Sequence, residues 1–526
     1  MMYGKECLEE KDGADKTLAD SWWDRQTARC VGVFTCVSLA VFPLFFHNKY
    51  IDILTSKYQF YYISVLTLAA ITVILSAGKA LDGGNHVPVK KLLTGFRKTM
   101  SLPDMVIVLF LLVVLISTFG SDYFYESFWG NEGRYNGCFL WMIYTAAFFM
   151  VSRKLKFRPW YLDIFLIGGT AVCLFGIADY LGFDPLGLER GLKPEIGIIY
   201  TSTIGNVNHY TAYVSLVAGA AAVLYGSAGT RGRAAWYGGC LFIAFTALVT
   251  GQSESVYLTI PALFGILPYF LKGKRYAGWR WMSALAAFFT VLLAVKLIEA
   301  GWPDRYVRLE GLFLMLTRGR LLYVAVPALW ILAFLARRIA VTRRFLWLWT
   351  ALLALFLAAG IAILCDINLA GHGERYGGAA QYLQFDDQWG NGRGYAWNHA
   401  WVSFRGFPWR KKLFGYGPDT FGILMVEERR TEMMEKFGYV FDDAHNEYLQ
   451  YLVTTGVLGL ACYLLLIGSS LRQMIKSCGD SPSIGAVAAA VFCYHVQAVV
   501  NINVPIVAPV MWTLLCVGLA GGRDTS

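Results

Sequence analysis

The sequence predicts an all-α, polytopic integral membrane protein. Hydrophobic residues make up 56% of the 526 residues, and charged residues 16%. The mean hydropathy is +0.48, and apolar runs recur that approach the roughly 20 residues needed to cross a bilayer core. Such runs are expected to be helices, because lipid offers no hydrogen-bond partner to free backbone groups.

The apolar runs predict about 12–14 transmembrane helices by this length criterion. Several runs are shorter than a full span. The fourteen candidate spans cover residues 31–46, 60–77, 103–119, 138–151, 161–178, 208–226, 235–250, 255–271, 281–298, 321–336, 345–364, 448–470, 483–500 and 505–520.

Lys and Arg residues gather after the even-numbered spans. They are Lys79, Lys90, Lys91, Arg97, Lys98, Arg153, Lys154, Lys156, Arg158, Arg231, Arg233, Lys272, Lys274, Arg275, Arg280, Arg337, Arg338, Arg343, Arg344, Arg472 and Lys476. Because short loops rich in Lys and Arg stay on the cytoplasmic side, both termini are predicted to be cytoplasmic. The formal net charge of +10 then reflects topology. The sequence has no nucleic-acid-binding motif, so no nucleic-acid partner is expected.

This topology divides the chain into four parts. Residues 1–30 are predicted to form a cytoplasmic segment without a cleaved signal peptide. Residues 31–365 hold the first eleven transmembrane helices, 366–447 an extracytoplasmic loop, and 448–526 the last three helices with a cytoplasmic tail. A loop as long as 366–447 is expected to carry helices of its own and a function.

Two amphipathic helices are predicted within this loop. Trp397, Trp401 and Phe404 recur at helical spacing, as do Phe421, Leu424 and Met425. Arginines are frequent on the predicted outer face, where topology disfavours them. A guanidinium binds phosphate through a planar fork, so an anionic ligand is one explanation, and ion pairs with Glu132, Glu310 or Asp386 are the other. These arginines are Arg134, Arg190, Arg305, Arg308, Arg318, Arg320, Arg375, Arg393 and Arg405.

Two motifs interrupt the apolar pattern near the end of the loop. They are G-Y-G-P-D-T-F at 415–421 and A-H-N-E-Y-L-Q-Y-L-V-T-T-G-V-L-G-L at 444–460. Weaker motifs precede them: N-E-G-R-Y-N-G at 131–137, T-I-G-N-V-N-H-Y-T-A-Y at 203–213 and R-G-Y-A-W-N-H-A-W at 393–401. In this order they resemble the O-antigen ligase and O-antigen polymerase superfamily.

The resemblance implies a GT-C-like bacterial glycosyltransferase of the cytoplasmic membrane, with its active site on the extracytoplasmic face. Such enzymes transfer a glycan from undecaprenyl diphosphate to an acceptor hydroxyl on a glycan or lipid-linked glycan. The implied partners are this donor, the acceptor, membrane lipids and other proteins of envelope polysaccharide assembly. The resemblance implies no cofactor. It does not decide between ligase and repeat-unit polymerase.

His445 is the candidate catalytic base, because a neutral imidazole can accept the proton of the acceptor hydroxyl. A loop or helix-capping histidine is the alternative. Asn446 is expected either to hold the imidazole or a sugar hydroxyl, or to cap the following helix. Asn206 and Asn208 are expected to contact the glycan or to cap a helix.

Arg134 and Arg393 are the leading candidates to stabilise the leaving diphosphate, and Arg405 and Arg320 come next. Family members commonly have Ser-Arg-Gly where this chain has Q-S-E-S at 252–255. Arg318 or Arg320 is therefore expected to supply the missing guanidinium. Glu254 itself is either a functional acid or an interfacial residue.

A metal-independent reaction is expected. The paired carboxylates Asp442 and Asp443 keep a Mg²⁺ or Mn²⁺ site open as an alternative. A different class of function is a transporter or flippase for a polysaccharide lipid, which would need charged residues at helix breaks deep in the membrane. Lys296 is almost alone in such a position, which favours the enzyme.

Overall fold

The computed structural model describes residues 21–82, 99–302, 308–479 and 481–524. Within these ranges the regular structure is almost entirely helical, with one short antiparallel pair, β1 (Tyr200–Thr201) and β2 (Gly205–Asn206). The all-α prediction is therefore confirmed. Lys90, Lys91, Arg97, Lys98 and Arg305, which entered the charge argument, lie outside the described residues.

Ten helices in the described residues are long and apolar enough to cross a membrane, or eleven if one bent pair is a single span. The first, Trp22–Leu44, joins α2 (Trp22–Cys36), a π-helical turn and α3 (Phe42–Leu44). The others are α4 (Ile53–Asp82), α6 (Leu102–Phe119), α9 (Trp160–Tyr180), α11 (Val207–Ser227), α12 (Arg231–Thr250), α14 (Ala277–Gly301), α17 (Arg343–Asn368), α23 (Gly456–Ser477), and α24 (Pro482–Gln497) extended to Val500.

The predicted count of 12–14 is higher because it includes shorter helices. These are α8 (Cys138–Lys154), α13 (Val256–Phe270) and α25 (Ala508–Asp524). The bent pair is α15 (Gly311–Arg318) and α16 (Leu321–Ala336), which meet at 87°. Each of the fourteen predicted runs overlaps a helix, so the difference in count arises from the length criterion.

One predicted span has the wrong start. The run 448–470 is split into α22 (Glu447–Thr454) and α23, which begins at Gly456. Gly456 has φ of +71°, and a side chain there would clash with the backbone of Leu413. The glycine therefore permits both the break and the close approach of another segment. The candidate membrane span begins after this break.

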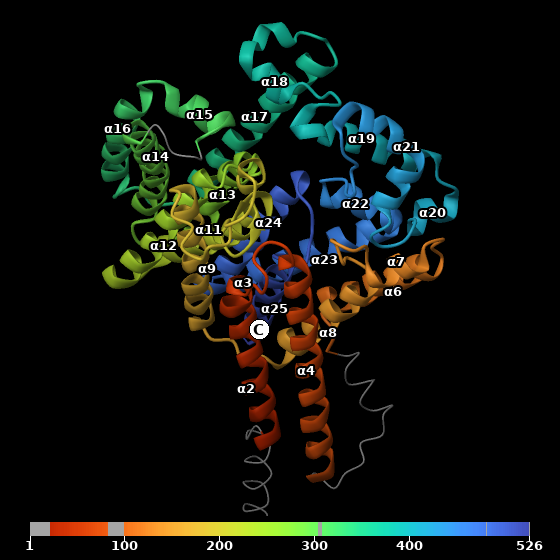
Figure 1. Ribbon diagram of the computed structural model, residues 1–526. Helices are drawn as coiled ribbons and strands as arrows, with labels where there is room; N and C mark the ends of the chain where they lie inside the picture. The colour runs from red at the N-terminus through yellow and green to blue at the C-terminus, as the bar shows by residue number, and fades with distance from the viewer. Residues whose placement is uncertain (1–20, 83–98, 303–307, 480, 525–526) are drawn as a thin grey trace, which may run out of the picture.

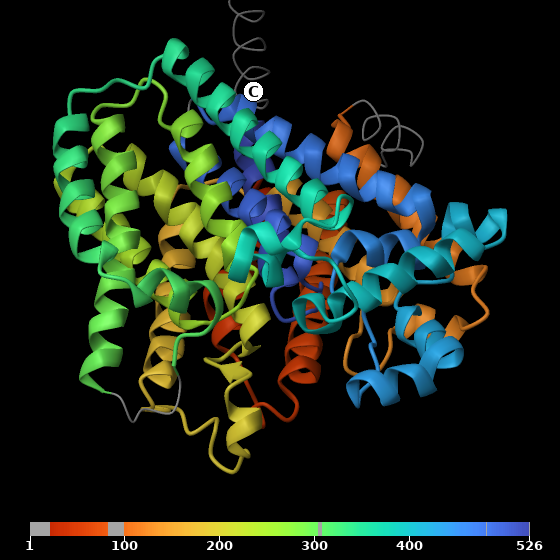
Figure 2. The ribbon, with the colours of Figure 1, turned by 90° about the horizontal axis from the view of Figure 1, so that it is seen from above.

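The helices form a wide bundle with a lateral extension. In Figure 1, α2 and α4 extend downward beyond the other helices, whereas α19 (Trp389–Gly406), α20 (Trp409–Phe414), α21 (Phe421–Phe437) and α22 lie at the upper right. The view from above places this blue group opposite the green helices α14 and α16 (Figure 2). The remaining short helices are α7 (Phe124–Trp129), α10 (Pro194–Gly197), α18 (Ala380–Leu383) and a 3-10 helix at Gly373–Ala379.

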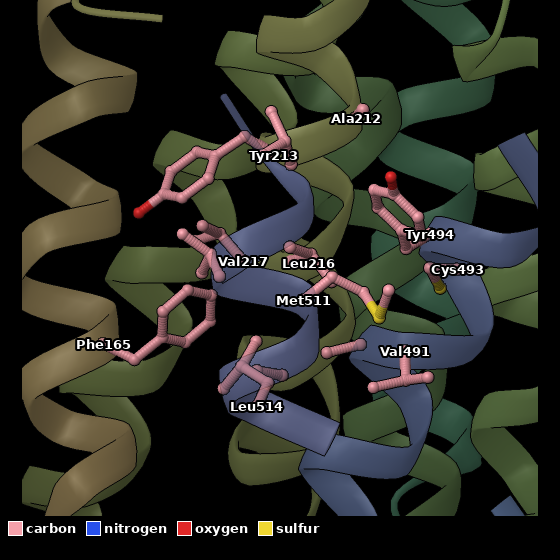
Figure 3. Packing of buried hydrophobic residues seen from close by; sticks show 14 of the residues in the cluster. Phe165, Ala212, Tyr213, Leu216, Val217, Val491, Cys493, Tyr494, Met511 and Leu514 are labelled. Atoms are coloured by element: carbon pink, nitrogen blue, oxygen red, sulfur yellow. The ribbon is translucent and has the colours of Figure 1, made fainter. Parts of the chain in front are cut away.

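Helix α11 occupies the centre of the bundle. Its apolar window is 89% buried, and it packs against α24, α12 and α9. A side chain at Gly219 would lie 2.8 Å from the Cα atom of Ala490 in α24, so small residues allow this close contact. Around that contact, Phe165 of α9, Leu216 and Val217 of α11, and Met511 and Leu514 of α25 fill the core (Figure 3).

Charged side chains join helix ends at one end of the bundle. The buried Asp104, at the start of α6, accepts hydrogen bonds from Arg153 Nη2 at 2.8 Å and Arg523 Nη2 at 2.6 Å. The other end of α6 contacts the extension, where Ser117 Oγ donates to the carbonyl of Thr454 at 2.9 Å. The extension therefore lies at the end of α6 remote from this basic cluster.

The long loop 366–447 carries α19 and α21, where the two amphipathic helices were predicted. With α22 they enclose a separate small core that includes Ala400, Phe404, Phe421 and Leu424. Trp401 was one of the residues that define the predicted amphipathic pattern, but it is 48% exposed. The buried positions of α19 instead follow the four-residue spacing of Ala396, Ala400 and Phe404.

Candidate active site

Asp419 joins two of the motifs that the sequence displays. Its carboxylate accepts hydrogen bonds from the backbone N–H groups of Asn131 at 2.7 Å and Asn136 at 3.1 Å. The aspartate belongs to G-Y-G-P-D-T-F, and both donors belong to N-E-G-R-Y-N-G. The loop that carries Arg134 is thus held at its two ends by a residue almost 300 positions later. Sequence reasoning did not identify this role of Asp419.

Glycine permits the tight packing of the G-Y-G-P-D-T-F segment. Gly417 has φ of +126°, and a side chain there would clash with the hydroxyl groups of Ser121 and Ser127. Ser121 Oγ also donates to the carbonyl of Tyr416 at 2.6 Å. The segment is therefore fixed against the C-terminal end of α6 and against α7, so Asp419 has a defined position.

Arg134 forms a forked ion pair with Asp442. Its Nε lies 3.1 Å from Oδ2 and its Nη2 lies 2.5 Å from Oδ1. The arginine side chain is 15% exposed, whereas that of Asp442 is 58% exposed. The neighbouring carboxylates raise the already high pKa of Arg134 against the opposing effect of burial. A permanently charged guanidinium is the result.

Arg393 follows a run of left-handed residues at the start of α19. Gly390, Asn391 and Gly392 have φ of 60°, 59° and 85°, and regular helix resumes at Arg393. Its Nη1 lies 2.9 Å from Oε2 of Glu254, in the connection between α12 and α13. The partners Asp442 and Glu254 differ from the proposed partners Glu132, Glu310 and Asp386. The sequence left Glu254 as either a functional acid or an interfacial residue. In the structure it is the ion-pair partner of Arg393.

His445 has an unusual backbone conformation. Its φ is +48°, in the left-handed region of backbone conformation that residues other than glycine rarely adopt. Its backbone N–H donates to Asp443 Oδ1 at 2.8 Å. Directly after it, the Asn446 side chain accepts hydrogen bonds from the N–H groups of Tyr448 at 3.0 Å and Leu449 at 3.1 Å. Asn446 therefore caps α22, one of the two roles expected for it.

Arg393 and Arg134 lie close enough to His445 for their charges to act on its imidazole. Burial, together with the positive charges of Arg393 and Arg134, lowers the pKa of His445 to about 4, whereas Asp442 acts in the opposite direction. His209 of α11 also interacts electrostatically with Arg134 and His445. At neutral pH the imidazole of His445 is uncharged, the form that can accept a proton.

Two buried aspartates support this group. Burial raises the pKa of Asp443 to about 7 and that of Asp419 to about 7, while Arg134 opposes both shifts. Both carboxylates accept backbone hydrogen bonds that fix a candidate site residue or its loop. Their role is to position His445 and Arg134.

Glu447 is a second residue that sequence reasoning missed. Its side chain is 1% exposed. Its Oε1 accepts hydrogen bonds from Tyr463, from Tyr451 at 3.1 Å and from Asn503 Nδ2 at 2.8 Å. A small cavity of about 20 Å³ adjoins Glu447, Asn503 and Asp419, with room for a water molecule. The signal available in the sequence was its place directly after His445 and Asn446.

The other predicted site residues lie elsewhere. Arg405 is exposed near the end of α19, 12 residues beyond Arg393 and hence roughly 18 Å further along the helix. Arg320 is exposed at the bend between α15 and α16. Neither is among the charges that act most on His445. The structure therefore does not bring these two arginines to the central group.

Asn206 and Asn208 stand at the start of α11. Asn206 caps the helix by accepting the N–H of Asn208 at 2.9 Å, which is the alternative to glycan contact. The Oδ1 of Asn208 accepts from Ser253 Oγ at 2.7 Å and thereby fixes the α12–α13 connection beside Glu254. Both asparagines thus have structural roles close to the site.

The described residues contain no group of three or more His, Cys, Asp or Glu side chains that could hold a metal ion. Asp442 and Asp443, the pair behind the metal alternative, are engaged with Arg134 and with the backbone of His445. Both oxygens of Asp442 and Oδ1 of Asp443 accept hydrogen bonds in these positions.

The family model described as O-antigen ligase matches residues 309–464 of the chain. This match confirms the resemblance to the O-antigen ligase and polymerase superfamily. It includes Arg393, Asp419 and His445. Arg134 lies outside it, but Asp419 holds the loop of Arg134 and Asp442 pairs with its guanidinium. Among curated proteins, no match to the chain was found.

Proposed function

From the O-antigen ligase domain at residues 309–464, we propose that this protein is a membrane glycosyltransferase. It transfers a glycan from undecaprenyl diphosphate to an acceptor hydroxyl at the extracytoplasmic face of the bacterial cytoplasmic membrane. The observation that carries the proposal is that hydrogen bonds bring the segments of Arg134, Arg393 and His445 together. Arg134 pairs with Asp442, three residues before His445, and Tyr439 of the same segment bonds to Asn391, close to Arg393 in the chain.

The proposed reaction is a single displacement at the anomeric carbon. The bond between that carbon and the diphosphate oxygen breaks while the acceptor oxygen forms a new bond, which inverts the configuration. His445 accepts the acceptor's proton, and the electron pair leaves with the diphosphate. Arg134 and Arg393 stabilise the developing negative charge, as preorganised cations do in sites without a metal.

Donor binding strengthens the base in this scheme. Arg393 and Arg134 lower the pKa of His445 in the ligand-free protein. A diphosphate that neutralises these charges removes part of that effect, so the imidazole becomes a better proton acceptor when the donor is bound. The site thereby couples base strength to occupancy.

Ligase and repeat-unit polymerase share this chemistry and differ in the acceptor. The discriminating experiment offers purified protein in proteoliposomes an undecaprenyl-diphosphate-linked glycan and two acceptors. One is a lipid-linked core glycan, and the other is a second copy of the donor repeat unit. A ligase is expected to give one product, on the lipid-linked core glycan. A polymerase is expected to give a ladder of products from the donor repeat unit.

The catalytic proposal is tested with His445→Ala and His445→Gln in the same assay. Loss of transfer on the order of 10²–10⁴-fold with unchanged donor binding is expected, since only the base is removed. The wild-type protein should remain active in EDTA. Near-full activity of both variants, or a metal-dependent wild type, would contradict the proposed chemistry.

A further inference from the structure

Arg134 and Arg393, whose charges act on His445, are each paired with a carboxylate that is more exposed than the arginine. The side chain of Arg393 is 9% exposed and that of Glu254 is 43% exposed. Arg134 and Asp442 show the same contrast, at 15% and 58%. In each pair the buried partner is the cation, and the carboxylate lies on its solvent side.

The backbone of Glu254 is fixed, although its side chain is not enclosed. Ser253 and Ser255, on either side, are buried at 2% and 1% exposure. Ser253 Oγ donates to Asn208 Oδ1 at 2.7 Å, and the two serine hydroxyls lie 2.9 Å apart. This connection belongs to the membrane bundle, whereas Arg393 belongs to the outer segment. The carboxylate of Glu254 therefore reaches Arg393 from a defined anchor and can rotate away into solvent.

The contact between Arg393 and Glu254 engages few of the N–H donors of the guanidinium. Among the described residues, the side chain of Arg393 forms one hydrogen bond, from Nη1 to Glu254 Oε2. A guanidinium has five N–H donors, and a phosphate group can take two in a fork. Glu254 thus engages only part of the Arg393 guanidinium, which could bind a larger anion.

We infer that Glu254 competes with the donor diphosphate for Arg393 and so acts as a specificity residue of the anion site. This inference rests on the proposed function. Ion pairs with an exposed carboxylate are weak, so a diphosphate with two charges displaces Glu254 readily. The phosphodiester headgroup of an ordinary membrane lipid has a single charge and competes less well. Glu254 thereby reserves Arg393 for the donor in a membrane rich in anionic lipid.

The test measures binding of undecaprenyl diphosphate to the purified full-length protein in nanodiscs that contain neutral lipid. Glu254→Gln keeps the size and a hydrogen-bond acceptor but removes the charge. The Kd is expected to fall by about two- to fivefold, the range of an exposed ion pair. Adding phosphatidylglycerol to the nanodiscs should weaken donor binding in the variant more than in the wild type.

Asp122→Asn is the matched control. Asp122 is 67% exposed and pairs at 2.9 Å with Lys411, which is 16% exposed, so the exposure contrast is the same away from His445. This variant should bind the donor as the wild type does. An unchanged or higher Kd for Glu254→Gln would overturn the inference, because Glu254 would then position Arg393 and not compete for it.

The outcome separates this inference from the proposed function. Tighter binding by Glu254→Gln in a protein that transfers no glycan would support the competition and refute the transferase. Weaker binding by the variant in a protein that does transfer glycan would leave the transferase in place and refute the competition. A wild-type protein that does not bind undecaprenyl diphosphate would refute both.

Discussion

The backbone N–H of His445 donates a 2.8 Å hydrogen bond to the carboxylate of Asp443, two residues earlier in the chain. This bond stabilises the left-handed conformation of His445, at φ of +48°. A strained backbone at a candidate catalytic residue persists only where its surroundings fix it. Asp443 is therefore a positioning residue for the proposed base.

We predict that Asp443→Ala lowers kcat by up to roughly 10²-fold, because a base displaced by about 1 Å loses that much. The KM for the donor should change little, since Arg134 and Arg393 remain. Asp443→Asn retains an acceptor oxygen and should restore most of the activity. Steady-state kinetics of the two variants checks this. Equal loss in both would show that the negative charge matters and not the hydrogen bond.

The pH dependence of transfer should reflect the lowered pKa of His445. Because this pKa is about 4 in the ligand-free protein, the imidazole stays neutral as the pH falls from 7 to 5. kcat/KM, which reports the free enzyme, should therefore hold over that range and fall only near pH 4. In kcat the fall should appear at higher pH, because the bound donor neutralises the arginines.

Asp443 provides the control for this pH profile. Burial raises its pKa to about 7, so it takes up a proton as the pH falls through that value. If the acid limb belongs to His445, Asp443→Asn should leave its position almost unchanged. A limb near pH 7 in the wild type that vanishes in Asp443→Asn would assign it to the aspartate.

Lysine should only partly replace Arg134 or Arg393 in the use of the donor. Replacing either by alanine removes a cation from the leaving group, with an expected loss on the order of 10²–10³-fold. Lysine restores the charge without the planar fork, so partial recovery is expected. Arg405→Ala is the comparison, since Arg405 is exposed and remote along α19. Full recovery by lysine would show that charge alone suffices.

The sequence was sufficient to predict the helices because a membrane span is set by apolar length. It also indicated Arg134, Arg393 and His445 through local motifs. The ion-pair partners were not predictable in the same way, since Asp442 lies 308 residues from Arg134 and Glu254 lies 139 residues from Arg393. Such pairs depend on how helices pack, which the pattern of one segment does not contain.

Helix caps show the opposite case. Asn206 and Asn446 precede α11 and α22 directly, so capping was an evident alternative to substrate contact, and the structure shows it. The break at Thr455 was not predicted, because 448–470 is mostly apolar and carries no charged residue. Gly456 permits it through its left-handed backbone and its contact with Leu413, a tertiary feature.

The last prediction concerns Glu447 and the proton that it carries. Burial raises the pKa of this fully enclosed carboxyl group. Its Oε1 accepts three hydrogen bonds, but Oε2 and the nearby Asn503 Oδ1 have no partner among the described residues. Two adjacent acceptors need a donor between them, and a neutral, protonated Glu447 provides one directly or through a water in the cavity.

A glutamine mimics that neutral acid, because its amide N–H₂ can donate where the carboxyl O–H does. Glu447→Gln should therefore keep the midpoint of thermal unfolding and the transfer activity. Glu447→Ala leaves Tyr463 and Asn503 without their acceptor and should lower the free energy of unfolding by about 1–3 kcal/mol. Unfolding of both variants in detergent, followed by fluorescence, checks this. If glutamine destabilises as much as alanine, the buried group is charged and a bound cation or proton-donating partner must balance it.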